Sequence, residues 1–357
     1  MAAVQVLGAG GGDGVAERVV GDLRERGREV REFSFRAGRG GRGRGLQHVV
    51  DRMRTEVMAP STYPAPSSVH LFGWRAVVAG AAARRPRGPA LVGHLGDGPP
   101  RSCVEHLDGA RLQRLVWAAA RSLDCVVLDS QWAVEQALAA GVPRTRVVRG
   151  LPVAPPPGED HAWTARRVER PRRVLAVGGV GQPAGTDMLL QAVGRLADVE
   201  LVVAAPVSVT QAELRPAERW LRAESERLGV RRAVARLAPF SLDLLAECDL
   251  VVDAATTAGG SDGVVAAMSR RRAVLASDLG PKAEAVVPGT TGELVPPGRD
   301  WRAWCGYVVR LLRDPFKLEA YGDAGLERSR VGFAPSRRAD LIDQVHAQLS
   351  RTIAAAC

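Results

Sequence analysis

Two series of short apolar segments that alternate with amphipathic ones constrain the fold of this chain more than any single motif. In the first series, the apolar segments that suit strands are residues 4–7, 30–35, 68–72, 90–95, 125–128 and 146–148. The segments with helical periodicity between them are residues 15–23, 74–84, 112–122 and 132–140. Strand and helix taking turns at this spacing predicts a parallel sheet with helices on both faces.

The stretch LPVAPPPGEDHAWTARRVERPRR, residues 151–173, interrupts the alternation. Its run of three prolines cannot continue a helix or a central strand. A second series follows, with strands expected at residues 174–177, 200–204, 250–253 and 273–277, and helices at 186–196, 212–228, 242–248 and 264–270. From residue 301 onward the pattern is helical, ending in a helix near 341–353. We therefore expect two α/β domains, at residues 1–153 and 172–335. A linker at 154–171 would join them, and a C-terminal helix at 336–357 would pack back on the first domain.

Bulk composition is that of an ordinary globular protein, with 46% hydrophobic and 25% charged residues in 357. No run of eighteen apolar residues occurs, and the N-terminal segment lacks the basic-then-apolar form of a signal peptide. These patterns favour a cytoplasmic protein. Five scattered cysteines, without a C-x-x-C pair or a nearby histidine, favour neither a metal site nor a disulfide framework.

The charge of the chain is basic, with a formal net charge of +10. Among the 49 basic residues, Lys282 and Lys317 are the only lysines. Together with the abundant Ala, Gly and Val, this indicates a GC-rich coding bias of the actinobacterial type. A basic surface favours anionic partners, which include nucleotide sugars, anionic lipid headgroups and nucleic acid.

Two glycine-rich segments occur in the first half. The first, GAGGGDG at residues 8–14, follows a strand and opens a helix, so its backbone N–H groups could face an anion. It does not match G-x-G-x-x-G, because Asp13 or Val15 stands at the third glycine. A nicotinamide cofactor is therefore not expected, and no other cofactor is. The alternative is a flexible turn.

The second glycine-rich segment, RAGRGGRGRG at residues 36–45, is similar to an RGG tract. Such tracts can bind nucleic acid, but this one is short and lacks interleaved aromatic residues. A solvated loop is the favoured interpretation, and nucleic acid is not an expected partner. A loop facing an anionic membrane surface is the third alternative.

In the second half, the segment VGGVGQPAGTDMLLQA, residues 177–192, is followed by ECDLVV at 247–252 and by the stretch 271–298. In order and spacing these resemble the donor-binding half of the family 4 (group 1) retaining glycosyltransferases. The matching residues of the first segment are Gly178, Gly185, Asp187, Leu189, Leu190 and Ala192. The resemblance implies the GT-B architecture, in which two doubly wound Rossmann-like domains face each other across a cleft.

Several charged residues of that family pattern are replaced. Gly179 and Ala184 stand where an arginine and a lysine clamp the donor diphosphate. Cations are useful there because the leaving diphosphate gains negative charge in the transition state. Ala258 and Ala266 stand where two glutamates hold the sugar and the ribose. Glu284 is the donor-side carboxylate that remains, with capping of a helix terminus as its alternative role.

The resemblance also assigns site residues one by one. The residues expected to bind the nucleotide-sugar donor are Gly178, Gly179, Thr256, Thr257, Gly259, Gly260, Ser261 and Glu284. The loop with Gly10, Gly11 and Gly12 would line the acceptor side. Asp97 aligns with an aspartate near the sugar, whereas Gly96 takes the place of the family histidine. His94 lies two residues away, as a catalytic candidate or a structural histidine.

Two functions follow from this pattern. The first is a transferase that moves a sugar from a nucleotide donor to an unknown acceptor, with retention of configuration. In this hypothesis the diphosphate rests on the backbone N–H groups of Gly259, Gly260 and Gly263 at a helix start. The second is a catalytically inactive homologue that binds a ligand or a partner transferase. Nucleic-acid binding through the arginines is a third hypothesis, and no metal site is expected.

Overall fold

The computed structural model describes residues 4–9, 15–27, 29–35, 50–51, 53, 68–85, 88–98, 109–157, 171–205, 211–230 and 235–356. The chain divides into two compact units, which are described separately below. Unit 1 comprises Met1–Pro152 together with Pro335–Cys357, and unit 2 comprises Val153–Ala334. The chain therefore leaves unit 1 after residue 152 and returns to it at residue 335.

Unit 1 contains a six-stranded sheet in the order β2-β1-β3-β4-β5-β6, and every neighbouring pair is parallel. The strands are β1 (Val4–Ala9), β2 (Val30–Phe35), β3 (Ser68–Phe72), β4 (Ala90–His94), β5 (Cys125–Leu128) and β6 (Val147–Arg149). All residues of β3, β4 and β5 are buried, as expected for strands that helices cover on both faces.

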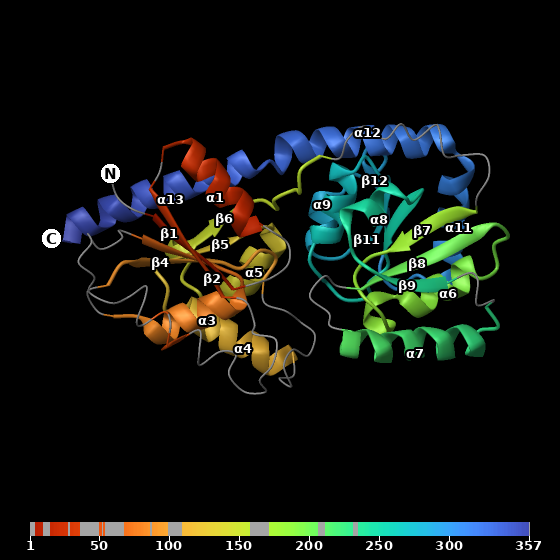
Figure 1. The fold of residues 1–357 in the computed structure, drawn as a ribbon, viewed down its shortest axis with the longest axis horizontal. Helices are drawn as coiled ribbons and strands as arrows, with labels where there is room; N and C mark the ends of the chain where they lie inside the picture. Colours follow the sequence, from red (N-terminus) through yellow and green to blue (C-terminus); the bar gives the residue numbers. More distant parts are fainter. Residues whose placement is uncertain are drawn as a thin grey trace. The chain divides into compact units, whose positions relative to one another are not determined.

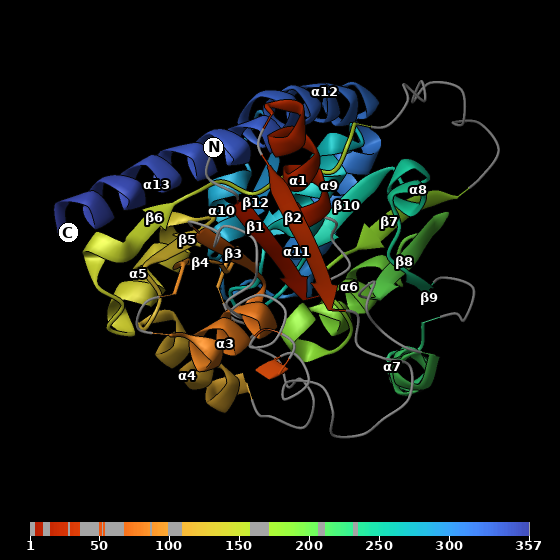
Figure 2. The same cartoon turned by 60° about the vertical axis from the view of Figure 1, so that its left-hand side comes forward.

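Helices form the two outer layers of unit 1 (Figure 1). The helices are α1 (Val15–Glu25), α3 (Trp74–Ala83), α4 (Gly109–Ala120), α5 (Gln131–Ala139), the short η2 (Arg144–Arg146) and α13 (Pro335–Ala356). The apolar sides of α3, α4 and α5 form one core with the sheet. Helices α1 and α13 contact each other and cover the opposite face (Figure 2). The C-terminal helix therefore closes one face of the first sheet.

Unit 2 contains a second parallel sheet of six strands, in the order β12-β11-β10-β7-β8-β9. The strands are β7 (Arg172–Ala176), β8 (Val199–Ala205), β9 (Ala235–Pro239), β10 (Leu250–Asp253), β11 (Val274–Ser277) and β12 (Gly292–Val295). From β7 the chain moves to β8 and β9 on one side, and then returns to add β10 on the other side of β7.

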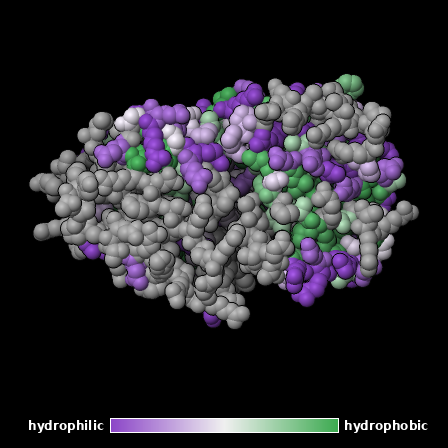
Figure 3. Space-filling view, viewed as in Figure 1, coloured by the Kyte–Doolittle hydropathy of each residue, from purple (hydrophilic) through white to green (hydrophobic). Residues whose placement is uncertain are grey.

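The helices of unit 2 also lie on both faces of its sheet. They are η4 (Gln182–Ala184), α6 (Thr186–Val193), α7 (Gln211–Arg227), α8 (Leu242–Ala246), α9 (Asp262–Ser269), α10 (Pro281–Ala285), α11 (Trp301–Arg313) and α12 (Pro315–Gly332). Apolar residues of α6, α7 and α11 form the main core on one face. On the other face, α9 lies against β10 and β11, α10 contacts β11, and α8 contacts α9. The surface of α7 is largely hydrophilic (Figure 3), in agreement with the polar-rich helix expected there.

The alternation of strands and helices is confirmed, and most predicted boundaries agree with the structure to within a few residues. Two strands were not expected from the sequence, β9 and β12, and both lie at the edges of the second sheet. The last helix spans Pro335–Ala356, close to the C-terminal helix expected at 336–357. Within the described residues, no helix combines the length and the apolar character needed to span a membrane.

Candidate functional site

The order of the strands in unit 2 indicates where a ligand would bind. Strands β7 and β10 are neighbours, but the connections that follow them run to opposite sides of the sheet. In open parallel sheets, the crevice at the carboxyl ends of two such strands is the usual ligand site. Seven of the eight residues expected to bind the donor lie in the loops that follow β7 and β10 or directly precede α9, and Glu284 follows β11 in α10.

The loop after β7 is shaped by glycines. Gly178 and Gly179 both have φ of 102°, a conformation that L-residues with side chains rarely adopt. A side chain on Gly185 would overlap the carbonyl oxygen of Ala254, so the loop after β10 packs directly against this glycine. The hydroxyl of Thr186 donates a hydrogen bond to the Gly179 carbonyl over 3.1 Å. The first loop is thus held by its own helix and by its neighbour.

The two positions where the family pattern has cations differ in their surroundings. Around Gly179, apart from its chain neighbours, no atom of the described residues lies within 4 Å of the point where a Cβ would stand, so the space there is open. Ala184 is buried. The missing arginine therefore leaves room for a ligand, whereas the missing lysine position is enclosed by protein.

The loop after β10 leads into α9. Ala254 and Ala255 are buried, whereas Thr256 and Thr257 are exposed. The amide of Thr256 donates to the carbonyl of Pro183 over 3.0 Å, which joins this loop to the one after β7. The hydroxyl-bearing residues that were expected to bind the donor thus stand on a loop whose start is fixed and whose middle is open to solvent.

The entry to α9 combines exposed glycines with a tight contact to the sheet. Gly259 and Gly260 are exposed, and Ser261 is the buried N-cap residue of α9. Gly263 lies in the first turn, where a Cβ would come within 3.1 Å of Val177. A larger residue at 263 would push α9 away from the end of β7. Asp262 is exposed in the same turn.

Glu284 lies in α10, after the loop that follows β11, and is half-buried. The guanidinium of Arg328, from α12, donates to the backbone carbonyls of Glu284 and Ala285 over 3.0 and 2.8 Å. Burial lowers the pKa of Arg328. The backbone of α10 is thus held by a cation, and donor binding and capping remain the two alternatives for the Glu284 carboxylate.

One feature of this edge of the sheet was not predicted from the sequence. Asp253, the last residue of β10, forms a buried ion pair with Lys282 of α10, with 2.9 Å between Oδ1 and Nζ. The Lys282 side chain is completely buried. The rarity of lysine in this chain and the aspartate at the end of an apolar strand are the signals that could have identified the pair.

In unit 1, the structure places His94 inside the protein. It is the last residue of β4, is 3% exposed, and stacks on Phe72 with 4.2 Å between ring centroids. Its Nδ1 accepts a hydrogen bond from Arg338 over 3.3 Å, and its Nε2 lies 2.9 Å from Nδ1 of His70. Since a guanidinium can only donate, His94 is neutral with its proton on Nε2, and that proton is donated to His70.

Both histidines are poor bases in this environment. Burial and the neighbouring His70 and Arg338 hold the pKa of His94 well below its ordinary value. Burial and His346 lower the pKa of His70 to about 3. This geometry supports the structural role of His94 over the catalytic one. Asp97 lies three residues further on, half-buried in a turn between Gly96 and Gly98, both of which have positive φ.

Arg338 was not singled out by the sequence either. It reaches from α13 to the carboxyl ends of the unit 1 strands, and its side chain is 2% exposed. Its Nη2 donates to Oδ1 of Asp129, directly after β5, and to the carbonyl oxygen of Leu151 over 2.6 Å. The amide of Asp129 in turn donates to the carbonyl of Gly96 over 2.7 Å. The C-terminal helix is thereby connected to the turn that carries Asp97.

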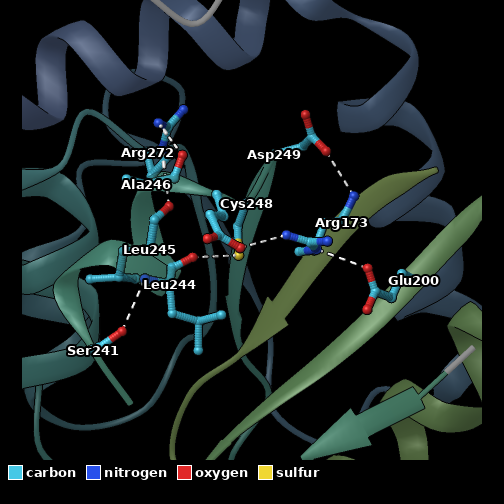
Figure 4. Close-up of polar contacts among 10 residues, drawn as sticks. Arg173, Glu200, Ser241, Leu244, Leu245, Ala246, Cys248, Asp249 and Arg272 are labelled. Carbon is cyan, nitrogen blue, oxygen red and sulfur yellow. Dashed lines mark hydrogen bonds and ion pairs between the residues drawn. The ribbon is translucent and has the colours of Figure 1, made fainter. Parts of the chain in front are cut away.

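A second polar cluster of unit 2 lies at the opposite, amino edge of the sheet (Figure 4). Arg173, in β7, forms ion pairs with Glu200 and Glu247, both over 2.8 Å. The backbone amide of Arg173 donates to Asp249, the residue before β10. These contacts join β7, β8 and β10 at their beginnings, so this cluster stabilises the sheet at the end away from the candidate site.

Some expectations lie outside the described residues. They are the loop with Gly10, Gly11 and Gly12, the arginine-glycine segment at 36–45, and residues 158–170 of the expected linker. Within the described part of the chain, no group of three or more His, Cys, Asp or Glu side chains is arranged to hold a metal ion.

A protein-family model matches the part of the chain that contains this candidate site. Residues 171–314 match the family model described as glycosyl transferases group 1. The matched segment contains both loops, α9, Lys282 and Glu284. The matched segment is therefore glycosyltransferase-like.

Solved structures of low sequence identity confirm the expected GT-B fold, and one curated relative matches a short segment of the chain. A segment of 83 residues is 37% identical to the lipopolysaccharide core biosynthesis mannosyltransferase LpcC of Rhizobium leguminosarum bv. viciae, and it spans 23% of each chain. A sucrose-phosphate synthase from Thermosynechococcus elongatus is similar in structure, with a TM-score of 0.79 and 16% identity over 99% of this chain and all of that one. Anabaena HepE in complex with UDP-glucose gives a TM-score of 0.67 and 17% identity over 99% of this chain and all of HepE.

Proposed function

We propose that this protein is a glycosyltransferase that takes its sugar from a nucleotide-sugar donor bound by unit 2. The observation that supports this most is the pair of joined loops at the carboxyl ends of β7 and β10, inside the segment that matches the family model. The Anabaena neighbour of the same fold is a complex with UDP-glucose, so a UDP-linked hexose is the first donor to test.

In this proposal the diphosphate binds to backbone N–H groups and hydroxyls in place of the family's cations. The open space at Gly179 admits the phosphates, and the exposed Gly259 and Gly260 offer amides near the start of α9. Thr256 and Thr257 add hydroxyl donors on the same loop. Hydrogen bonds from neutral donors stabilise a diphosphate less than ion pairs do, so we expect weaker donor binding than in relatives that keep both cations.

The stereochemistry of the proposed transfer follows only from the resemblance, which implies retention, and the resemblance names no acceptor. The alternative function is that of an inactive homologue. The four replacements at positions 179, 184, 258 and 266 favour this alternative. An inactive homologue would still bind the nucleotide sugar in the same donor site, but it would not transfer the sugar. A contact with an anionic membrane surface or with a partner transferase would fit either function.

Titration calorimetry with UDP- and GDP-linked hexoses tests donor binding. We expect saturable heat with at least one donor, weakened in Thr256→Val and Thr257→Val and unchanged in Thr290→Val, an exposed threonine in the turn before β12. Absence of heat at millimolar donor, with the protein folded, would exclude the transferase. Slow hydrolysis of the bound donor would indicate an active enzyme, whereas binding without hydrolysis would indicate an inactive homologue.

A further inference from the structure

Lys282 is the most unusual buried charge in the described part of the chain. It is one of two lysines among 49 basic residues, and its side chain is completely enclosed. A buried ammonium group loses its hydration, and one close carboxylate compensates for that loss only when the geometry is good. Its Nζ lies 2.9 Å from Oδ1 of Asp253, whose side chain is only 6% exposed. Such a pair stabilises a fold only weakly, so its presence needs another reason.

Its place in the sheet supplies that reason. Asp253 ends β10, and the same Oδ1 accepts the backbone amide of Ala255 over 3.1 Å. On one side, Gly178 of the loop after β7 lies so close that a Cβ there would be 3.4 Å from Oδ1. On the other side, Lys282 belongs to α10, which follows β11. One carboxylate therefore contacts segments that follow three adjacent strands.

The contact with Ala255 fixes the direction in which the loop after β10 leaves the sheet. The next amide, that of Thr256, donates to Pro183 in the loop after β7. Beyond Thr256 the chain is exposed up to the buried N-cap at Ser261, apart from the half-buried Ala258. Hence the buried pair holds the base of the loop, and the exposed part carries the groups proposed to face the diphosphate.

We propose that the Asp253–Lys282 pair positions the two diphosphate-binding loops of unit 2 without contacting the ligand itself. Lys282 neutralises and orients the Asp253 carboxylate, and Asp253 holds Ala255 beside Gly178. The inference rests on the proposed donor site and adds the residues that preorganise it. Preorganised backbone donors cost less to order when an anion binds, and this matters most in a site that lacks its usual cations.

The test compares Lys282→Met with Lys317→Met in the full-length chain. Methionine keeps much of the length of lysine but removes the charge. Lys317 is the other lysine of the chain and pairs with Glu293 at the surface of α12, so its variant is a matched control. Calorimetry with UDP and with UMP isolates the second phosphate, because uracil, ribose and the first phosphate are common to both.

We expect Lys282→Met to weaken UDP binding about tenfold, the equivalent of one or two lost hydrogen bonds, and to leave UMP binding within about twofold of wild type. Asp253→Asn keeps an oxygen acceptor for Ala255 and Lys282, so it should retain more of the UDP affinity than Lys282→Met does. A pair with a merely structural role would lower thermal stability while leaving the ratio of UDP to UMP affinity unchanged, and that result would overturn the proposal.

Hydrogen exchange tests the role of the Asp253–Lys282 pair separately from the proposed donor binding. In Lys282→Met, but not in Lys317→Met, the amides of Ala255 and Thr256 should exchange faster than in wild type. If the wild-type protein binds neither nucleotide, the proposed function fails, and exchange alone decides whether the pair orders the loops; unchanged exchange would refute it. If Lys282→Met does not fold, the double variant Asp253→Asn/Lys282→Met leaves no unpaired buried charge and takes the same measurements.

Discussion

Single residues at the candidate site are constrained by backbone contacts more than by side-chain chemistry. Gly185 has φ of 68° and faces the carbonyl of Ala254, so both its conformation and its lack of a side chain are required. Gly178, with φ of 102°, is similarly placed beside Asp253. The loops can therefore approach each other closely enough for backbone groups to serve a ligand.

Gly185→Ala should destabilise unit 2 by more than about 2 kcal/mol, because the new methyl group is strained in its conformation and overlaps a backbone oxygen. Gly229→Ala is the matched control: its φ is 67°, and no atom lies within 4 Å of the added methyl. That control should cost about 1 kcal/mol, from backbone strain alone. Urea denaturation measures both; equal losses would contradict the close packing of the two loops.

The sequence pattern indicated that these glycines lie in the loops of the donor site, but it did not indicate the buried ion pairs of the fold. A glycine between a strand and a helix is visible in a local pattern. Lys282 and Asp253 are 29 positions apart, and Arg338 and Asp129 are 209 apart, so each pair exists only in the folded chain. A charged residue in a sequence is normally a solvated one. Asp253 and Lys282 are marked only by the end of an apolar strand and by the rarity of lysine, and nothing local indicates that Arg338 and Asp129 are buried.

Among the secondary-structure elements, α13 has the widest influence on unit 1. It covers one face of the sheet with Ala339, Ile342 and Val345, and it supplies Arg338 to the carboxyl edge. It also carries His346, whose Nδ1 lies 3.2 Å from the hydroxyl oxygen of Ser68. The helix therefore brings both apolar and polar groups to the face of the sheet that it shares with α1.

Arg338→Met should destabilise unit 1 by about 3 kcal/mol, because it leaves the Asp129 carboxylate nearly buried without its cation. Arg330→Met, on the exposed side of α12, should change stability by less than about 0.5 kcal/mol. Denaturant midpoints give both values. A loss at position 338 no larger than at 330 would show that the contact with Asp129 contributes nothing.

Unit 1 should lose stability as the pH falls below about 6.5. His70 and His94 are neutral in the folded state because their pKa values are lowered, to about 3 for His70, whereas the unfolded chain takes up protons near 6.5. The contribution of these histidines to the free energy of unfolding is therefore fully present above about pH 6.5 and is lost as the pH falls toward 3. From His70 alone, the loss at pH 5 is about 2 kcal/mol. The charged or titratable groups around them are Arg338, Asp129 and His346.

Hydrogen exchange of the β3 and β4 amides at pH 7.5 and pH 5 measures this decline. In His70→Gln, the difference between the two pH values should be smaller than in wild type. A difference of the same size in the variant would mean that His70 does not carry the effect.

The two strands that sequence analysis missed were missed for the same physical reason. Strands β9 and β12 are edge strands, and they contain Pro239 and Gly292, residues that are unfavourable in a strand. Neither has the long apolar run of a central strand. The central strands β5 and β10 were predicted with their observed boundaries, because burial on both faces demands continuous apolar residues.

For the whole molecule, two cores in two units predict that unfolding is not a single transition. Each unit has its own parallel sheet and its own apolar cluster. Differential scanning calorimetry should therefore resolve two transitions. A nucleotide-sugar at a hundred times its Kd should stabilise one of them by about 2.7 kcal/mol, the one that Gly185→Ala also shifts. A donor that raised only the transition shifted by Arg338→Met would place its site in unit 1.

The return of the chain to unit 1 at Pro335 also sets an order of events during synthesis. Unit 2 is continuous in sequence, whereas unit 1 needs residues from both ends of the chain. On the ribosome, residues 1–152 emerge first, and one face of their sheet is covered only by α1 until α13 has been released. The unit that is made first is therefore completed last, and its exposed apolar face is the part of the nascent chain most in need of a chaperone.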